Sequence, residues 1–127
     1  MNQLQTVCHR VEPINDWLRS QGLDIRVSAP LSPPTEEHVT HGQETYELTN
    51  YTIFSAANRL FFTAEGWKNG LHKVTRVRRI SASSEGRVSI TEYIREVNES
   101  KLGKQIPITE PITKNFDEVG SEDIRFW

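Results

Sequence analysis

Apolar residues near the start of the chain recur with the period of an α-helix. Steps of three and four residues, which place side chains on one helix face, connect Leu4, Val7, Val11, Ile14, Trp17 and Leu18. Pro13 interrupts this stripe, because proline lacks a backbone donor and clashes with the preceding turn. We therefore expect either a helix kinked at Pro13 or a second helix that begins near Glu12 and Pro13, with proline in its first turn. Gly22 is a suitable stop for this helix.

The next part of the chain has the alternation and the β-branched and aromatic content of strands. We expect strands at 23–28, 45–55, 58–64, 71–81 and 87–90. Residues 54–62 also fit a short helix. Asn69-Gly70 is the strongest hairpin signal, because both residues adopt positive φ readily. Short turns favour antiparallel pairing, so the expected fold is α+β, with the N-terminal helix packed on a small antiparallel sheet of about four to five strands.

The stretch from residue 87 to residue 104 fits two kinds of element. Ser89 and Glu92 have the spacing of a helical capping box, and the apolar residues that follow fit a helical stripe. The first residues of the stretch alternate as in a strand. We expect a strand over 87–90 and a short helix near 91–102.

The charge distribution divides the chain into three segments. The formal net charge of the 127 residues is −2, but it is −4 over residues 1–67, +5 over residues 68–104 and −3 over residues 105–127. Such asymmetry is typical of an anion-binding face, or of segments that neutralise one another in the fold. The last segment also lacks a clear period, so we expect an extended acidic tail, free or packed back on a single domain of residues 1–104.

Composition and motifs narrow the class of protein further. The single cysteine, Cys8, excludes an intrachain disulfide and a cysteine-rich zinc site. No apolar run approaches about 18 residues, so we expect no membrane span. The first residues do not have the pattern of a signal peptide, which favours a cytoplasmic location. We find no nucleophile elbow, glycine-rich phosphate loop or dinucleotide fingerprint, and we expect neither enzyme activity nor a cofactor.

The most basic stretch of the chain is 71–81, with Lys73, Arg76, Arg78 and Arg79. Strand alternation places Arg76 and Arg78 on one face, and Lys73 and Arg79 on the other. Neither face is purely apolar, so we expect this strand to lie at a sheet edge or to contain a bulge.

These cations, with aromatic residues close by in the sequence, form a candidate binding surface. Lysine and arginine neutralise phosphates and aromatic rings stack on bases, as in proteins that hold single-stranded nucleic acid. An acidic protein partner, or the acidic tail itself, would complement the same charges. The terminal aromatic pair either folds onto the core or anchors a partner. The residues expected to bind a partner or a polyanion are Trp67, Lys68, Lys73, Arg76, Arg78, Arg79, Arg87, Phe126 and Trp127.

A weaker candidate site is the pair His38 and His41. On a short helical turn from Thr35 to Gly42, imidazoles three residues apart share one face and bind zinc or a similar metal. The alternative is a solvated polar loop, because no third histidine lies near in the sequence.

Three functions remain open. The leading hypothesis is a small non-enzymatic interaction module, an adaptor, inhibitor or regulatory protein, that binds an acidic protein partner through the basic hairpin face, the aromatic C-terminus or both. The alternative is a nucleic-acid-binding regulator that uses the strand 71–81. The third is a metal-binding protein or small enzyme at His38 and His41. The sequence leaves the oligomeric state open, a homodimer included.

Overall fold

The protein folds around one curved antiparallel sheet. A computed structural model describes residues 11–27, 37–41, 44–70, 72–96 and 105–125. Along the described chain lie α2 (Glu12–Ser20), β1 (Glu37–His41), β2 (Glu44–Ala56), β3 (Arg59–Lys68), β4 (His72–Ala82), β5 (Arg87–Glu96), β6 (Gln105–Pro107), β7 (Ile112–Asn115) and the 3-10 turns η1 (Phe116–Glu118) and η2 (Ser121–Asp123). The α+β class with an antiparallel sheet is confirmed.

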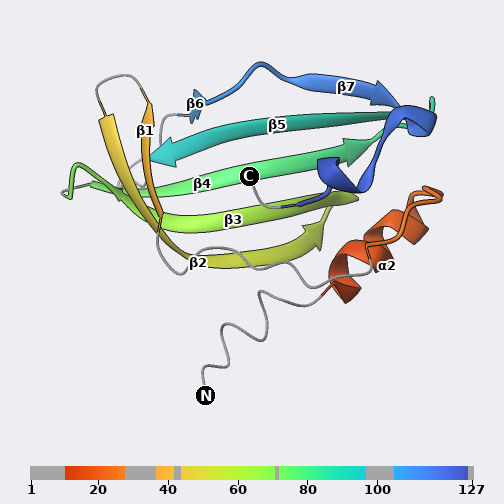
Figure 1. Cartoon of the computed structure of the whole chain (residues 1–127), viewed down its shortest axis with the longest axis horizontal. Helices are drawn as coiled ribbons and strands as arrows, with labels where there is room; N and C mark the ends of the chain where they lie inside the picture. Colours follow the sequence, from red (N-terminus) through yellow and green to blue (C-terminus); the bar gives the residue numbers. More distant parts are fainter. Residues whose placement is uncertain (1–10, 28–36, 42–43, 71, 97–104, 126–127) are drawn as a thin grey trace.

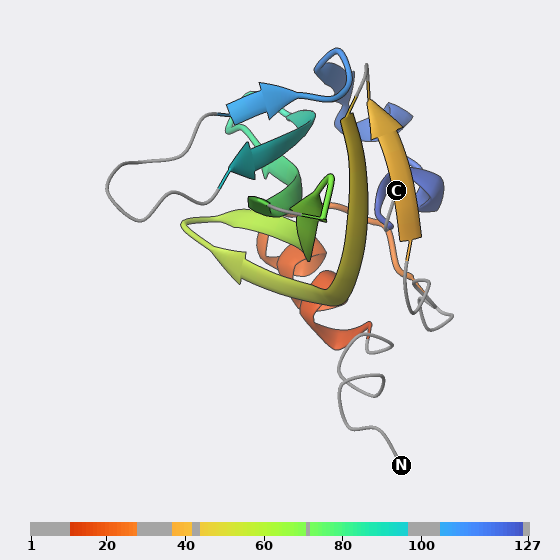
Figure 2. The ribbon, with the colours of Figure 1, turned by 90° about the vertical axis from the view of Figure 1, so that its left-hand side faces the viewer.

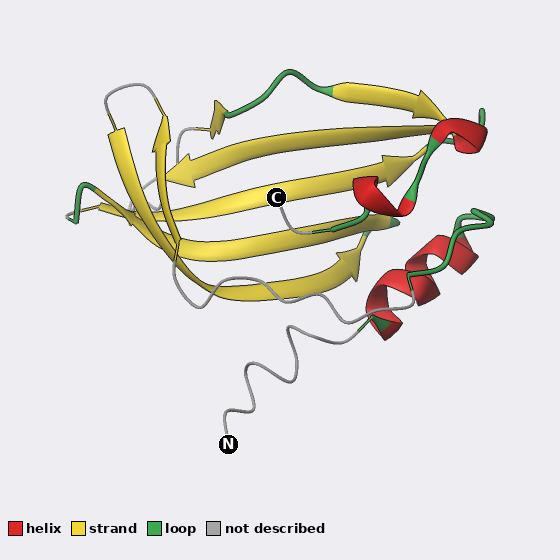
Figure 3. Cartoon of the chain, in the orientation of Figure 1, coloured by secondary structure: helices red, strands yellow, loops and turns green. Residues whose placement is uncertain are grey.

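The sheet is a meander in which each strand from β1 to β6 pairs with the next, and β7 also pairs with β5. Figure 1 shows the long strands side by side, and Figure 2 shows the sheet curling so that β2 turns away from β4 and β5. In the described residues the sheet has seven strands, more than the expected four to five, because β1, β6 and β7 were not recognisable as strands, while the expected strand at 23–28 does not form. Figure 3 shows α2 at one end of this sheet.

For the C-terminal half, the expected helix near 91–102 is wrong in the described residues, and of the two alternatives for the tail, free or packed back, residues 105–115 follow the second. Thr91–Glu96 do not start a helix but continue β5, which pairs with β4 along its length. The capping-box spacing competes with a two-residue alternation in which Val88, Ile90 and Ile94 are buried, and tertiary pairing favours the strand. Residues 97–104 lie outside the described part. Residues 105–115 are not a detached tail, since β6 and β7 both join the sheet.

The strand β4 lies in the middle of the sheet, so the expectation of an edge strand is wrong. It pairs with β3 on one side and with β5 on the other, without a register shift. The presence of basic residues on both faces of β4 therefore has another cause. The arginines on its buried side have partners inside the fold, as described below.

The helix α2 begins at Glu12 with Pro13 in its first turn, which agrees with the second of the two expected arrangements. Its buried residues join the core formed by one side of the sheet: Ile14, Trp17 and Leu18. The indole Nε1 of Trp17 donates a hydrogen bond of 3.1 Å to the backbone oxygen of Asn58, in the β2–β3 hairpin. This bond fixes the helix at the end of the sheet.

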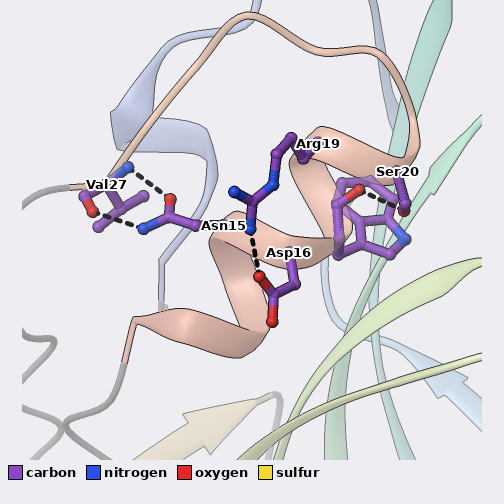
Figure 4. Close-up of polar contacts among 6 residues, drawn as sticks. Asn15, Asp16, Arg19, Ser20 and Val27 are labelled. Carbon is purple, nitrogen blue, oxygen red and sulfur yellow. Dashed lines mark hydrogen bonds and ion pairs between the residues drawn. The ribbon is translucent and has the colours of Figure 1, made fainter.

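The segment after α2 is not a strand, although its burial alternates as the sequence indicates. Leu23 and Val27 are buried and Ile25 is half-buried, but the segment has no strand partner in the described residues. The Asn15 side chain supplies the missing pairing instead. Its amide accepts a hydrogen bond from the Val27 N–H and donates one to the Val27 oxygen, both at 2.9 Å (Figure 4). An ion pair between Arg19 and Asp16 lies beside this contact.

The hairpin turns agree with the local sequence. Asn69 and Gly70 both have positive φ between β3 and β4, as expected for this pair. At the β2–β3 turn Ala57 and Asn58 also have positive φ, so residues 54–62 form a hairpin and not a helix. Each strand from β2 to β5 therefore runs antiparallel to its neighbour, and the register fixes which side chains share a face.

Candidate interaction surface

Strand alternation divides the basic residues of β4 between two environments. The inner face of the sheet is the side that forms the core, and it carries Arg76 and Arg78, each 7% exposed. The outer face is the opposite side and carries Lys73 and Arg79. The predicted division into two pairs is therefore present, but only the outer pair has solvent access.

Arg78 is held by partners within the chain. Its Nε donates to Glu92 Oε1 at 3.0 Å, and its Nη1 donates to the backbone oxygen of Arg125 at 2.9 Å. The guanidinium carbon lies 5.8 Å from the centroid of the Phe62 ring, within the range of a cation–π contact. Burial lowers the pKa of Arg78 from its usual value, and the hydrogen bond with Glu92 opposes that shift.

Two further cations from the predicted set also have internal partners. Arg76 Nη2 lies 4.0 Å from Glu92 Oε2, so one carboxylate serves both inner arginines of β4. Lys68 Nζ donates to Glu96 Oε1 at 2.7 Å, and this hydrogen bond raises the pKa of Lys68. The described contacts of Lys68, Arg76 and Arg78 are with residues of the same fold. Their binding of an external partner stays a prediction.

The C-terminal residues lie across the inner face. Ile124 is fully buried in the core, and Asp123 accepts hydrogen bonds from Lys114 Nζ at 2.9 and 3.0 Å and from the Gly120 N–H at 2.9 Å. Burial by itself would raise the pKa of Asp123, but the Gly120 N–H and the Lys114 ammonium hold it below its usual range. Phe126 and Trp127, which the sequence singled out, lie outside the described residues.

The outer face collects the other predicted side chains. Residues opposite one another in an antiparallel pair share a face, and Trp67 pairs with Lys73. Trp67 is 45% exposed, and Lys73 and Arg87 are also exposed. Register adds the exposed cations Arg59 and Arg95, of which only Arg59 was not recognisable as a candidate from the sequence. We call the outer side of β3, β4 and β5 the basic outer face, and its cations are Arg59, Lys73, Arg79, Arg87 and Arg95.

Aromatic rings lie on the same side of the sheet. Phe54 and Phe61 stack with their centroids 5.1 Å apart and an interplanar angle of 17°, and Phe54 is 44% exposed. The Arg79 guanidinium carbon lies 6.0 Å from the centroid of the Tyr93 ring. A shallow hollow beside Phe54 has a volume of about 480 Å³ and is lined by Asn50, Thr52, Phe54, Thr63, Glu65 and Thr75. Strand alternation in the sequence gives the face of each of these residues. Grouping them on one surface also requires the register between neighbouring strands, which the sequence did not provide.

The predicted metal site does not have the geometry on which it was based. Residues 37–41 form strand β1, so His38 and His41 do not lie on a helical turn. Side chains three residues apart share a face in a helix but not in a strand, because the strand period is two. The side chains of these two histidines lie outside the described structure. Elsewhere in the described ranges, no cluster of three or more His, Cys, Asp or Glu residues could hold a metal ion.

Comparisons with known proteins add no functional information. No protein-family model matches the chain, and neither a curated protein nor a solved structure matches it. Among the described residues, no helix is long and apolar enough to cross a membrane.

Proposed function

We propose that the protein is a non-enzymatic interaction module that binds an acidic protein partner through the basic outer face. The observation that carries the proposal is the segregation of charge by strand register. Five cations lie on the outer side of β3, β4 and β5, and on strands β2 to β5 that side has only two carboxylates, Glu47 and Glu65. Arg76 and Arg78, by contrast, are buried beside Glu92.

Physical arguments favour a protein partner for such a face. Complementary charge speeds encounter and fixes the orientation of docking, although it adds less to affinity than burial of aromatic anchors does. Trp67 and Phe54 are large exposed rings of the kind that dominate interface energies. A partner that presents carboxylates around an apolar centre would therefore match both features. The predicted contribution of Phe126 and Trp127 remains part of the proposal.

A double charge reversal on the basic outer face tests the proposal. We expect Lys73→Glu with Arg87→Glu to weaken binding of a short poly-L-glutamate peptide by about tenfold, which is about 1.4 kcal/mol. The measurement is fluorescence anisotropy at about 50 mM salt, where surface charges are weakly screened. The matched control is Arg19→Glu with Arg26→Glu, which changes net charge equally on an exposed part of α2 and the segment after it. An equal loss in both double variants, or no binding by the wild type, would contradict the proposal.

A second candidate is binding of single-stranded nucleic acid, favoured by the exposed Phe54–Phe61 stack beside the cations. Each base stacked on an aromatic ring contributes roughly 1–3 kcal/mol. If this function holds, Phe54→Ala weakens oligothymidine binding by about tenfold or more and leaves poly-L-glutamate binding unchanged. Ile112→Ala, at an equally exposed apolar residue on β7, is the control and leaves oligothymidine binding unchanged. Wild-type protein that does not bind oligothymidine excludes this candidate.

A further inference from the structure

The C-terminal residues Val119–Arg125, which we call the strap, cover part of the inner face. Val119 and Ile124 are buried in the core, and the backbone oxygen of Arg125 accepts the 2.9 Å hydrogen bond from Arg78. Figure 1 shows the end of the described chain passing in front of the sheet. The strap therefore lies over the central strands of the sheet.

The strap is attached less extensively than the strands beneath it. In the described residues its hydrogen bonds between backbone groups are local, from Val119 to Phe116, from Asp123 to Gly120 and from Ile124 to Ser121, and the bond from the Arg78 side chain to the Arg125 oxygen joins its backbone to β4. It makes no strand pairing there, whereas β4 is paired along both edges. Segments with few backbone bonds to the rest of the fold open at lower free energy than central strands. We therefore expect the strap to open at a lower free energy than the central strands.

The acceptor that the strap offers to Arg78 is a neutral carbonyl. A carboxylate would make a shorter, charge-assisted hydrogen bond with the same guanidinium, about twice as strong as a neutral one. The guanidinium has five N–H donors, so it can retain Glu92 while it accepts a new partner. The strap carboxylate Asp123 acts on Arg78 through its charge, whereas the hydrogen bond from Arg78 goes to the Arg125 oxygen, so an acidic segment would add a direct hydrogen bond from Arg78 to a carboxylate.

We propose that the inner face beneath the strap is a second binding surface, which takes an extended acidic segment of the partner in place of the strap. This inference rests on the proposed function only in taking the partner to be acidic. The strap itself indicates the required sequence, because Asp123 is followed by the fully buried Ile124. The incoming segment needs a carboxylate for Arg78 and an aliphatic side chain to fill the site that Ile124 leaves.

Hydrogen exchange of the wild-type chain tests this displacement directly. The probe is a synthetic peptide of sequence Glu-Ile-Glu-Glu-Ile-Glu at saturating concentration. We expect exchange of the Gly120, Asp123 and Ile124 amides to become at least about tenfold faster on binding, because the strap leaves the inner face. The central strands β3 and β4 should stay protected. Bound peptide with unchanged exchange in the strap would overturn the inference.

A matched pair of variants gives an independent readout. Asp123→Asn weakens the contact with Lys114 that holds the strap, and Asp117→Asn makes the same charge change at an exposed residue of η1. We expect Asp123→Asn to bind the peptide about tenfold more tightly than Asp117→Asn. Equal affinities would contradict displacement. One combination of results separates this inference from the proposed function. If Lys73→Glu with Arg87→Glu abolishes peptide binding, but the peptide never changes the hydrogen exchange of the strap amides in the wild type, the proposed function stands and this inference fails.

Discussion

Glu92→Gln is expected to lower the free energy of unfolding by about 3–5 kcal/mol, the cost of breaking a buried ion pair from one side. The Glu92 carboxylate faces both Arg76 and Arg78, at 4.0 and 3.0 Å, and the three side chains are between 8% and 16% exposed. Without this carboxylate the fold would bury two guanidinium groups that have lost their shared counter-ion. Urea denaturation followed by circular dichroism gives the change in unfolding free energy.

The control for this prediction is Glu47→Gln, which makes the same chemical change on the outer side of β2. Its expected effect is within about 0.5 kcal/mol, because exposed single charges contribute little. Replacing all three members of the cluster with apolar residues of similar volume should recover most of the stability. If Glu92→Gln behaves like Glu47→Gln, the inner arginines do not depend on Glu92.

Gly66→Ala is expected to lower the free energy of unfolding by about 3 kcal/mol, which is the upper part of the usual range for overpacking. A Cβ at Gly66 would lie 2.5 Å from Leu48 Cδ2 and 2.6 Å from the backbone oxygen of Glu47. The leucine can rotate, but the oxygen belongs to the neighbouring strand and can move only with it. The result would be strain between β2 and β3 next to Trp67, measurable by thermal and urea unfolding.

Two comparisons separate overpacking from backbone strain at Gly66. Gly86→Ala places a Cβ in open space at a φ of +81°, so its expected cost is only the roughly 1 kcal/mol of a left-handed alanine. Adding Leu48→Ala to Gly66→Ala removes one of the two clashes, so the combined cost should be less than the sum of the single costs. A Gly66→Ala cost no larger than that of Gly86→Ala would show that β2 and β3 approach less closely at this point.

The strand β4 contributes to both sides of the sheet, with Lys73 and Arg79 on the basic outer face and Arg76 and Arg78 beside Glu92 on the inner face. Cations on the inner side of a sheet need partners within the fold, because an unpaired buried charge is strongly destabilising. Glu92 is such a partner for Arg76 and Arg78, together with the backbone oxygen of Arg125. With the strap in place, the cations of β4 are thus divided between ion pairs that stabilise the fold and an exposed surface available for binding.

Local chemistry was enough to predict several parts of the fold. The positive φ values of Asn69 and Gly70 follow from the residues themselves. The assignment of Arg76 and Arg78 to one side of a strand, and of Lys73 to the other, requires only the two-residue period. The pairing of strands that are far apart in the chain could not be predicted from these local patterns. The capping-box spacing at Ser89 and Glu92 is a valid local signal, but in the structure both residues lie on β5.

The sequence by itself determined the class of fold, the turn at Asn69-Gly70 and the alternation that divides the cations, because these depend on neighbours within a few residues. Only the tertiary structure decided which side of the sheet is buried, that β4 is central, and that Glu92 lies opposite Arg78. It also decided that the strap contacts Arg78 while Arg59 and Arg95 join the outer cations. The physical reason is that register and burial arise from contacts between residues far apart in the chain, and no local pattern specifies them.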